Sequence, residues 1–502
     1  MTNVNSVDPR TGEILAVVGS ETTDEQVDAI CDRAAAAYRT IRERDRSWRS
    51  GLLRAMAEAL EGRRDKVVET ADAESALGAV RLNAELTRTC YQLRFFADVV
   101  DEGSFLEATI DHAGPTGMGP RPDLRRMLVA TGPVVVFGAS NFPLAFSVPG
   151  GDSASALAAG CPVVVKAHES HPATSQLCAD ILRDAAESVG APDGTIGIVH
   201  GRAAGGRLVR HPAITAVAFT GSQRGGEALM ELIDQRPSPI PFYGELGSVN
   251  PMVVTEAAAA ERAADIGKGF ADSFTLGVGQ FCTKPGLAFV PAGRAGDAVV
   301  EATAAAIREK PAAVMLNAGI AAAFGRGVEE MTAGAGIVRV ASGRSAQPGV
   351  AAQLLEVDEA DLTDRMLEET FGPVAVVVRY HDPASLAPAL NRLPSSLTAT
   401  LQTGSGEPTL EPAAQRALEE RAGRIVYNGF PTGVAVSWAQ HHGGGWPATN
   451  SLHTSVGATA IRRFLRPLTW QDAPESALPV ELRDATTGVP RRVDGVLVPA
   501  SE

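Results

Sequence analysis

The stretch Val134-Val135-Val136-Phe137-Gly138-Ala139-Ser140-Asn141-Phe142-Pro143 decides the predicted fold, because a short β-branched strand runs directly into a tight turn. Val163–Val165 is a second strand-like run, and a helix is expected over 152–159, between the two. Strands that alternate with helices predict βαβ units and a parallel sheet, whose ligand site lies beyond the carboxyl ends of the strands. We therefore expect an α/β protein whose functional side chains lie in turns that follow strands.

Upstream of that stretch the pattern is helical. Two overlapping capping boxes, Thr22 to Glu25 and Thr23 to Gln26, predict a helix that runs to about Arg44. The other upstream expectations are helices at 49–61, 63–75 and 82–100, a Gly- and Pro-rich boundary or excursion at 105–122, and a strand at 127–130. The first hundred residues are thus expected to be an all-helical scaffold.

Downstream the alternation of strands and helices continues and then starts again. The first series continues with a helix at 175–189 and strands at 195–200 and 213–219. The second series comprises helices at 257–274 and 295–309 and strands at 287–290, 374–379, 397–402 and 424–428, followed by a glycine-rich aromatic loop at 430–446 and a short helix or strand at 458–464. A second α/β domain is therefore expected before a polar, proline-rich tail.

Composition limits the classes of function. A chain of 502 residues with 45% hydrophobic residues predicts two or three folded domains. The net charge of −14 argues against binding to nucleic acid or to an anionic membrane. No apolar run approaches the roughly 20 residues that span a bilayer, and the N-terminus has no signal pattern, so we expect a cytoplasmic protein. Five cysteines without a C-x-x-C pair predict reduced thiols and no metal site.

One cysteine lies in a reactive setting. The stretch Gly277-Val278-Gly279-Gln280-Phe281-Cys282-Thr283-Lys284-Pro285-Gly286 places Cys282 after two glycines, where backbone N–H groups and a substrate can approach the sulfur. A buried structural cysteine is the alternative. We interpret Cys282 as a nucleophile.

Three further turns carry polar groups. Asn141 follows a strand and has a side-chain N–H that can donate to an oxyanion. Glu245, between glycines, is expected to have its pKa raised by burial, which suits general-base work near neutral pH. Glu369, in the sequence Glu-Glu-Thr-Phe-Gly-Pro, is either an exposed capping charge or an acceptor for a hydroxyl group.

No G-x-G-x-x-G opens a helix in this domain, so a dinucleotide site here would lack the usual fingerprint. The turn Phe219–Gly226 follows a strand, and its small residues, including Gly221, Ser222 and Gly226, would let a helix N-terminus face a pyrophosphate. Lys166, at another strand end, precedes Glu169 by three residues.

In this order, the motifs around Asn141, Lys166, Ser222, Glu245, Cys282 and Glu369 resemble the aldehyde dehydrogenase superfamily, and the resemblance runs from about Asp8 to Gln471. It implies the following roles. The catalytic residues are Cys282 as thiol, Glu245 as base and Asn141 as oxyanion donor. The cofactor residues are Lys166, Glu169, Gly221, Ser222, Gly226, Glu369 and Phe371.

The resemblance also implies an architecture. A Rossmann-like cofactor-binding domain is expected at 1–104 and 128–246, a second α/β catalytic domain at 247–454, and a small β oligomerisation arm at 105–127 and 455–470. Residues 471–502 are expected to be a tail without an assigned function. A homodimer or homotetramer follows from the arm.

The implied reaction is oxidation of an aldehyde to a carboxylic acid through a thiohemiacetal and a thioester. NAD or NADP is the cofactor, and Glu169 favours NAD because it would accept from a ribose hydroxyl and repel a 2′-phosphate. Glu245 favours hydrolysis of the thioester over its transfer to a larger thiol such as coenzyme A.

The strings 137–147 and 429–434 resemble one branch of the superfamily, which holds 2,5-dioxovalerate (α-ketoglutaric semialdehyde) dehydrogenases and NADP-dependent fatty aldehyde dehydrogenases. A carboxylate-bearing substrate needs an arginine or a backbone nest that the motifs do not identify. A set of aromatic residues is expected either to line a substrate tunnel or to be part of the core: Phe142, Phe146, Phe281, Phe430 and Trp438. We favour the semialdehyde, with the fatty aldehyde as the alternative.

Two rival interpretations remain from the sequence. A catalytically retired structural homologue would have no physical need for Cys282, Glu245 and Asn141. A cysteine hydrolase needs a Cys–His pair, and the histidines show no such motif. His441 and His442, in a glycine-rich loop, are expected to have surface or substrate-loop roles.

Overall fold

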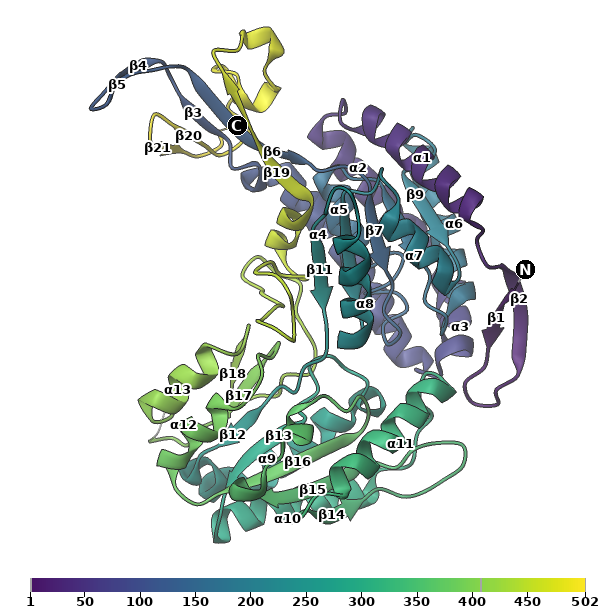
Figure 1. The fold of residues 1–502 in the computed structure, drawn as a ribbon, viewed down its shortest axis with the longest axis vertical. Coiled ribbons are helices and arrows are strands. Elements are labelled where there is room, and N and C mark those ends of the chain that lie inside the picture. Colours follow the sequence, from purple (N-terminus) through teal and green to yellow (C-terminus); the bar gives the residue numbers. More distant parts are fainter. Residues whose placement is uncertain (1, 407–408, 502) are drawn as a thin grey trace.

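The computed structural model describes residues 2–406 and 409–501. Two α/β domains lie one above the other in Figure 1, and a β arm extends from the upper domain. Within the described residues, no helix combines the length and apolar character that crossing a bilayer requires.

The chain begins with a hairpin, so the expectation of an all-helical opening is wrong for the first twenty residues. Strand β1 (Asn3–Val7) pairs antiparallel with β2 (Ile14–Ser20). The capping box of Thr23 with Gln26 is confirmed and begins α1 (Asp24–Ile41). The next helices are α2 (Arg46–Gly62), α3 (Arg64–Ser75) and α4 (Ala79–Glu102).

The first sheet is fully parallel, with the order β11-β10-β7-β8-β9. Its strands are β7 (Val134–Phe137), β8 (Val163–Lys166), β9 (Ile196–Val199), β10 (Ala216–Thr220) and β11 (Phe242–Glu245). Its connecting helices are α5 (Gly151–Ala159), α6 (Pro172–Ser188), α7 (Arg202–Arg210) and α8 (Gln223–Asp234).

The register of this sheet gathers its turns at one edge. Phe137 lies opposite Lys166, and Thr220 lies opposite Glu245. The turns that follow these strands therefore lie side by side, where parallel sheets bind ligands.

The second sheet has the order β14-β15-β16-β13-β12-β17-β18, and only β14 is antiparallel to its neighbour. Its strands are β12 (Met252–Val254), β13 (Leu287–Pro291), β14 (Val338–Ser342), β15 (Gln353–Asp358), β16 (Val374–Tyr380), β17 (Ala399–Gln402) and β18 (Ile425–Tyr427). Its helices are α9 (Glu256–Thr275), α10 (Arg294–Glu309), α11 (Ala318–Thr332), α12 (Pro383–Asn391) and α13 (Pro412–Glu419). Separate apolar clusters cover its two faces.

The arm sheet has the order β19-β6-β3-β20-β21 and corrects two expectations (Figure 1). The strand predicted at 127–130 belongs to β6 (Leu124–Ala130), which pairs with β19 (Leu465–Gln471) and not with the cofactor sheet. The expected tail adds β20 (Arg491–Val493) and β21 (Val496–Val498) beside β3 (Thr109–Asp111). The excursion also carries the small hairpin of β4 (Gly114–Thr116) and β5 (Gly119–Arg121).

Candidate active site

Cys282 lies between the two α/β domains, in the loop that precedes β13. It is half-buried, whereas the other four cysteines are buried. The backbone before it is left-handed at Gly277, Val278 and Gly279, with φ of 57°, 61° and 65°. A Cβ at Gly279 would lie 2.3 Å from the carbonyl group of Gly372, so only glycine allows this close approach.

Asn250 also fixes the loop, through hydrogen bonds to its backbone. Its side-chain N–H groups donate to the carbonyl oxygens of Cys282 at 2.8 Å and Lys284 at 3.0 Å. Asn250 is fully buried, and the sequence analysis gave it no role.

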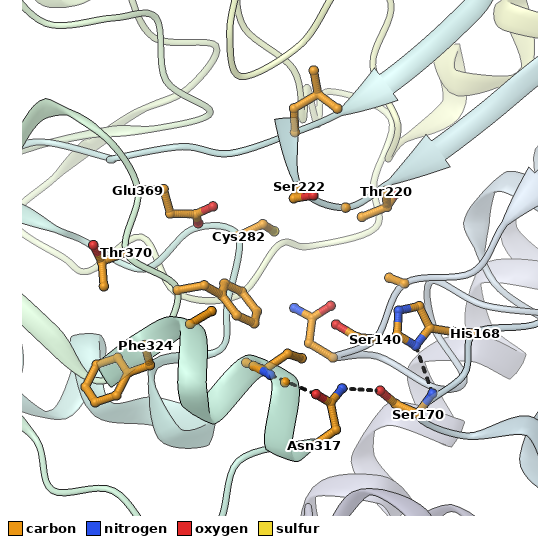
Figure 2. A pocket seen from close by; sticks show the side chains of 18 of the residues that line it. Ser140, His168, Ser170, Thr220, Ser222, Cys282, Asn317, Phe324, Glu369 and Thr370 are labelled. Carbon is orange, nitrogen blue, oxygen red and sulfur yellow. Dashed lines mark hydrogen bonds between the residues drawn. The ribbon is translucent and has the colours of Figure 1, made fainter. Parts of the chain in front are cut away.

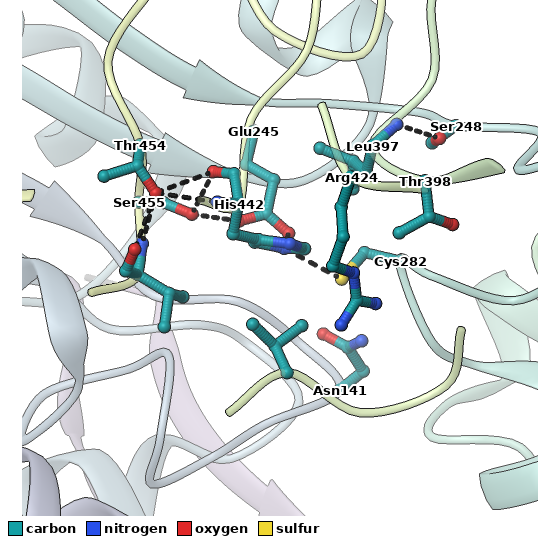
Figure 3. A network of polar contacts seen from close by, with 12 residues as sticks. Asn141, Glu245, Ser248, Cys282, Leu397, Thr398, Arg424, His442, Thr454 and Ser455 are labelled. Atoms are coloured by element: carbon teal, nitrogen blue, oxygen red, sulfur yellow. Dashed lines mark hydrogen bonds and ion pairs between the residues drawn. The ribbon is translucent and has the colours of Figure 1, made fainter. Parts of the chain in front are cut away.

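A histidine joins the predicted nucleophile to the predicted base. His442 Nε2 lies 3.6 Å from Cys282 Sγ and 2.9 Å from Glu245 Oε1, as Figure 3 shows. Ser455 Oγ donates to the other carboxylate oxygen of Glu245 at 2.8 Å. One side-chain atom each from Cys282, Glu245 and His442 lies within 4.8 Å of the other two.

His442 corrects the expectation of a surface or substrate-loop role. It is 1% exposed, and its backbone N–H donates to Thr454 Oγ1 at 2.7 Å. Its Nδ1 is buried and meets no partner among residues 2–406 and 409–501, so a proton there would be unpaired. The contact with Glu245 Oε1 calls for a proton on Nε2, which donates to the carboxylate.

The pKa of Glu245 also differs from expectation. Burial raises it, but the charge of His442 and hydrogen bonds from His442, Cys282 and Ser455 outweigh burial and lower the pKa to about 2. Glu245 is therefore ionised near neutral pH. Burial and the Glu245 charge raise the pKa of the Cys282 thiol well above its usual value, so thiolate formation requires a proton acceptor.

Asn141 lies beside the thiol at the turn after β7. Its Nδ2 donates to the carbonyl oxygen of Gln280 at 2.8 Å, which fixes the amide and leaves its second N–H. Its own carbonyl oxygen accepts from Arg81 Nη2 at 2.6 Å. The amide is thus held close to the loop that carries Cys282.

A cavity of about 680 Å³ runs between the domains and reaches Cys282. Figure 2 shows His168 and Ser170 at one end, and Cys282 with Glu369 toward the other. Predicted site residues that line it are Asn141, Glu169, Gly221, Ser222, Glu245, Cys282, Glu369 and Phe371. The cavity is also lined by Arg202, which the sequence analysis did not single out.

Two predicted cofactor residues are not among those that line this cavity. Lys166 is buried, and its Nζ pairs with Glu169. Gly226 allows α8 to approach β11, since a Cβ there would lie 2.5 Å from Leu246 Cδ2.

Glu369 is influenced by a second missed residue, Lys284. Lys284 Nζ is buried and donates to the carbonyl oxygens of Thr370 at 2.8 Å and Val374 at 3.0 Å. Burial raises the pKa of Glu369 to about 7, although the Lys284 charge opposes this. Burial lowers the pKa of Lys284 to about 8.

The predicted aromatic pocket divides into two sets. The rings of Phe142 and Phe146 lie 5.3 Å apart, and those of Phe142 and Phe281 lie 5.1 Å apart. Phe430 instead packs on α9, and Trp438 is half exposed against another ring.

Guanidinium groups cover the joined rings. The central carbon of Arg81 lies 4.9 Å from the Phe142 centroid and 4.8 Å from that of Phe281. That of Arg88 lies 5.0 Å from the Phe146 centroid. These rings are therefore flanked by positive charge.

Residues 1–466 match the sequence profile described as the aldehyde dehydrogenase family. This chain belongs to that family. The aldehyde dehydrogenase is 45% identical over 502 residues to alpha-ketoglutaric semialdehyde dehydrogenase 2 of Azospirillum brasilense, with 98% of this chain and 96% of the relative covered. It is 40% identical over 486 residues to the alpha-ketoglutaric semialdehyde dehydrogenase of Acinetobacter baylyi, covering 95% and 92%.

Solved structures show the same fold. Aldehyde dehydrogenase 21 of Physcomitrella patens, in complex with the product succinate, matches with a TM-score of 0.80 at 20% identity over 95% of this chain and 96% of that chain. The NAD+ complex of a Bacillus cereus aldehyde dehydrogenase matches with a TM-score of 0.79 at 21% identity over 94% and 93%. The predicted family, α/β fold class and enzyme class are therefore confirmed, as is dependence on NAD(P) at the level of the family.

The cavity of this aldehyde dehydrogenase fits such a cofactor. Its volume lies within the range typical of ligand sites, and it spans the edge at which the strands of the first sheet end. Ser222 caps α8, whose N-terminal N–H groups suit a pyrophosphate.

Proposed function

We propose that this enzyme oxidises α-ketoglutaric semialdehyde to 2-oxoglutarate, with Cys282 as the nucleophile. The observation that carries the proposal is the contact of one half-buried thiol with a His–carboxylate pair at the end of the cavity. The two relatives above, which span nearly the whole chain, support the substrate.

Nucleophilic attack begins with loss of the thiol proton. The sulfur of Cys282 gives its proton to the Glu245 carboxylate and bonds to the aldehyde carbon, whose oxygen becomes an alkoxide. The second N–H of Asn141 Nδ2 and the backbone N–H of Cys282 donate to that alkoxide.

Bound NAD(P) supplies a hydride acceptor, and loss of hydride from the thiohemiacetal carbon leaves a thioester on Cys282. Once Glu245 has released the thiol proton to solvent, a water attacks the thioester carbon and gives its proton to Glu245. The C–S bond breaks, the carboxylic acid leaves, and the departing thiolate of Cys282 takes that proton and is ready for another turnover. The low pKa of Glu245 keeps its carboxylate ionised near neutral pH and so able to accept a proton, and His442 orients that carboxylate by donating from Nε2.

For the cofactor, we propose that Glu369 and Phe371 hold the nicotinamide ribose, while the α8 N-terminus holds the pyrophosphate. Glu169 accepts from the adenine ribose hydroxyl. Burial raises the pKa of Glu169, but Lys166 outweighs it, so the carboxylate is charged and would repel a 2′-phosphate. We expect NAD to be used at least as well as NADP, and an NADP preference above about tenfold, or 1.4 kcal/mol, would contradict this.

The guanidinium groups over Phe142, Phe146 and Phe281 support a charged substrate over an aliphatic one. A nearby cation does not stabilise a buried alkyl chain, whereas it stabilises a bound carboxylate. The test compares kcat/KM for α-ketoglutaric semialdehyde with that for hexanal, following the growth of NADH absorbance. Faster oxidation of hexanal at equal concentration would exclude the semialdehyde as the preferred substrate.

We also propose that the arm sheet joins copies of the chain into a homodimer or homotetramer. The exposed side chains of β21 lie at an edge of that sheet that pairs with no other strand among residues 2–406 and 409–501, and they support this assignment. Light scattering after size exclusion should give a mass of two or four chains, and a monomer at micromolar concentration would contradict it.

A further inference from the structure

Three partly buried arginines lie near Cys282 without an ion-pair partner. Among residues 2–406 and 409–501, Arg81, Arg88 and Arg424 form no salt bridge with a carboxylate, although most buried charges are paired. Each also has one buried nitrogen without a hydrogen-bond partner in that part of the chain: Nη1 of Arg81, Nη1 of Arg88 and Nε of Arg424. Such groups call for a ligand or a structural explanation.

Arg88 and Arg424 are brought together by one loop. Arg88 Nη2 donates to the carbonyl oxygen of Val434 at 3.4 Å, and Arg424 Nη1 donates to that of Gly433 at 3.1 Å. Arg424 Nη2 also donates to Pro431 at 2.6 Å. Arg88 comes from α4 and Arg424 from the segment before β18, so the two guanidinium groups converge from different domains.

Both of these arginines are close enough to Cys282 for a thiolate there to interact with their charge. Burial lowers the pKa of each; the Glu85 charge and then a Cys282 thiolate oppose this for Arg88, and a Cys282 thiolate opposes it for Arg424. Figure 3 shows the guanidinium end of Arg424 turned toward Cys282 and Asn141. Arg81 differs, because it donates to Asn141 and covers two rings, which gives it a structural role in the oxyanion turn.

Among residues 2–406 and 409–501, no carboxylate lies within salt-bridge distance of Arg88 or Arg424. Glu85 acts electrostatically on Arg88, but its Oε1 accepts the N–H groups of Leu144 at 2.8 Å and Ala145 at 3.0 Å, and its buried Oε2 forms no hydrogen bond with either arginine. Glu245 is bound to His442 and Ser455. Within this part of the chain, neither arginine is therefore neutralised by a direct ion pair, and Arg424 lies beside Cys282 in Figure 3.

We propose that Arg88 and Arg424 bind the carboxylate of the substrate and so select a short aldehyde that carries a negative charge at its far end. This assignment rests on the proposed function and adds to it the residues that recognise the acid group. A planar guanidinium suits a carboxylate because it donates two parallel N–H groups, and the loop carbonyls hold both groups in place. A fatty aldehyde would leave both cations unpaired and would be rejected.

The test uses single substitutions in the full-length enzyme with saturating NAD. Arg88→Met and Arg424→Met keep the side-chain length and remove the charge, whereas Arg88→Lys and Arg424→Lys keep the charge without the planar fork. The matched control is Arg94→Met, on the same helix, whose side chain is 44% exposed. The substrates are α-ketoglutaric semialdehyde and pentanal, an uncharged aldehyde with the same number of carbons.

Each Met variant should lower kcat/KM for the semialdehyde by about 10- to 100-fold, mainly through KM, because a hydrogen-bonded charge loses its partner. The Lys variants should recover part of this loss. Pentanal oxidation should change by less than about threefold, and Arg94→Met should change neither substrate. Binding of glutarate, measured by calorimetry, should weaken about tenfold or more in both Met variants.

The outcomes separate the two proposals. A wild-type enzyme that oxidises pentanal better than the semialdehyde would overturn the proposed function. A wild-type preference for the semialdehyde that survives unchanged in both Met variants would overturn the arginine assignment alone. Equal losses for the two aldehydes, with unchanged binding of glutarate, would show that the arginines only hold the loop and would overturn the assignment as well.

Discussion

On the cofactor side of Cys282, a cavity of about 680 Å³ is lined by strand-end turns and by α11, whereas on the other side three phenylalanine rings pack beneath two arginines. The first side is formed largely by backbone and small residues, such as Gly221 and Ser222, that follow strands of one sheet. The second side is formed by long side chains from α4 and from the segments around 281 and 424. A cofactor common to a family can be held by the fold, whereas selection of one aldehyde depends on side chains that the fold only brings together.

The thiol is where both sides meet, so its removal should have the largest effect. Cys282→Ala should reduce aldehyde oxidation by at least about 10⁴-fold, since the covalent intermediate can no longer form. Binding of NAD, followed by calorimetry or fluorescence, should change little because the cavity is intact. Cys178→Ala, at a buried cysteine in α6, is the matched control. Activity that remains within tenfold in Cys282→Ala would remove the nucleophile from the proposal.

The next largest effect should come from His442, which touches the thiol and the carboxylate but does not line the cofactor cavity. His442→Ala should lower kcat by about 10²- to 10⁴-fold, the usual range for proton transfer, because His442 orients the Glu245 carboxylate that accepts the proton, while KM for NAD stays nearly constant. His441→Ala provides a control in the neighbouring, partly exposed residue. If the two variants behave alike, His442 serves only the packing of its loop.

A smaller effect is expected on the cofactor side alone. Arg202 lines the cavity with Glu169 and would pair with a 2′-phosphate, so Arg202→Ala should reduce kcat/KM for NADP about five- to tenfold and leave NAD nearly unaffected. Glu169→Gln should raise NADP use by a similar factor. Arg207→Ala, on the same helix but paired with Asp28, is the control. Equal changes in kcat/KM for NAD and NADP would contradict the placement of the adenine ribose 2′-position beside Arg202 and Glu169.

The smallest effect concerns stability against pH. The folded-state pKa of Glu245 is about 2, below its ordinary value of 4.5, so its ionised form stabilises the fold above about pH 4.5, and this contribution is lost as pH falls toward 2. The advantage in melting temperature of the wild type over Glu245→Gln should therefore shrink on acidification from pH 7 to pH 4. An advantage that grows over that range would mean that burial outweighs the hydrogen bonds. The pKa of Glu245 would then be higher in the folded state than in the unfolded chain.

Sequence patterns predicted the elements well where packing follows local rules. The strand Val134–Phe137 was predicted with the bounds it has, because four consecutive apolar residues suit a strand covered on both faces. The N-terminal hairpin was missed because Ile14, Leu15 and Val17 are exposed, so its strands show no alternation of buried and exposed residues that the sequence could reveal. The tail was missed for a related reason, since its two strands are three residues each and pair with a sheet formed more than 300 residues earlier.

By itself the sequence determined the family, the α/β class and a candidate nucleophile, because glycines, β-branched runs and one cysteine leave local signatures in a single segment. Only the tertiary structure could add His442, which is 160 residues from Cys282 and 197 from Glu245 along the chain. The same holds for the pKa of Glu245, which burial alone would raise and which its partners lower. Charge and hydrogen bonding depend on distance in space and not on separation along the chain. Arg88 and Arg424, from different domains, come together only because both donate to carbonyl groups of one loop.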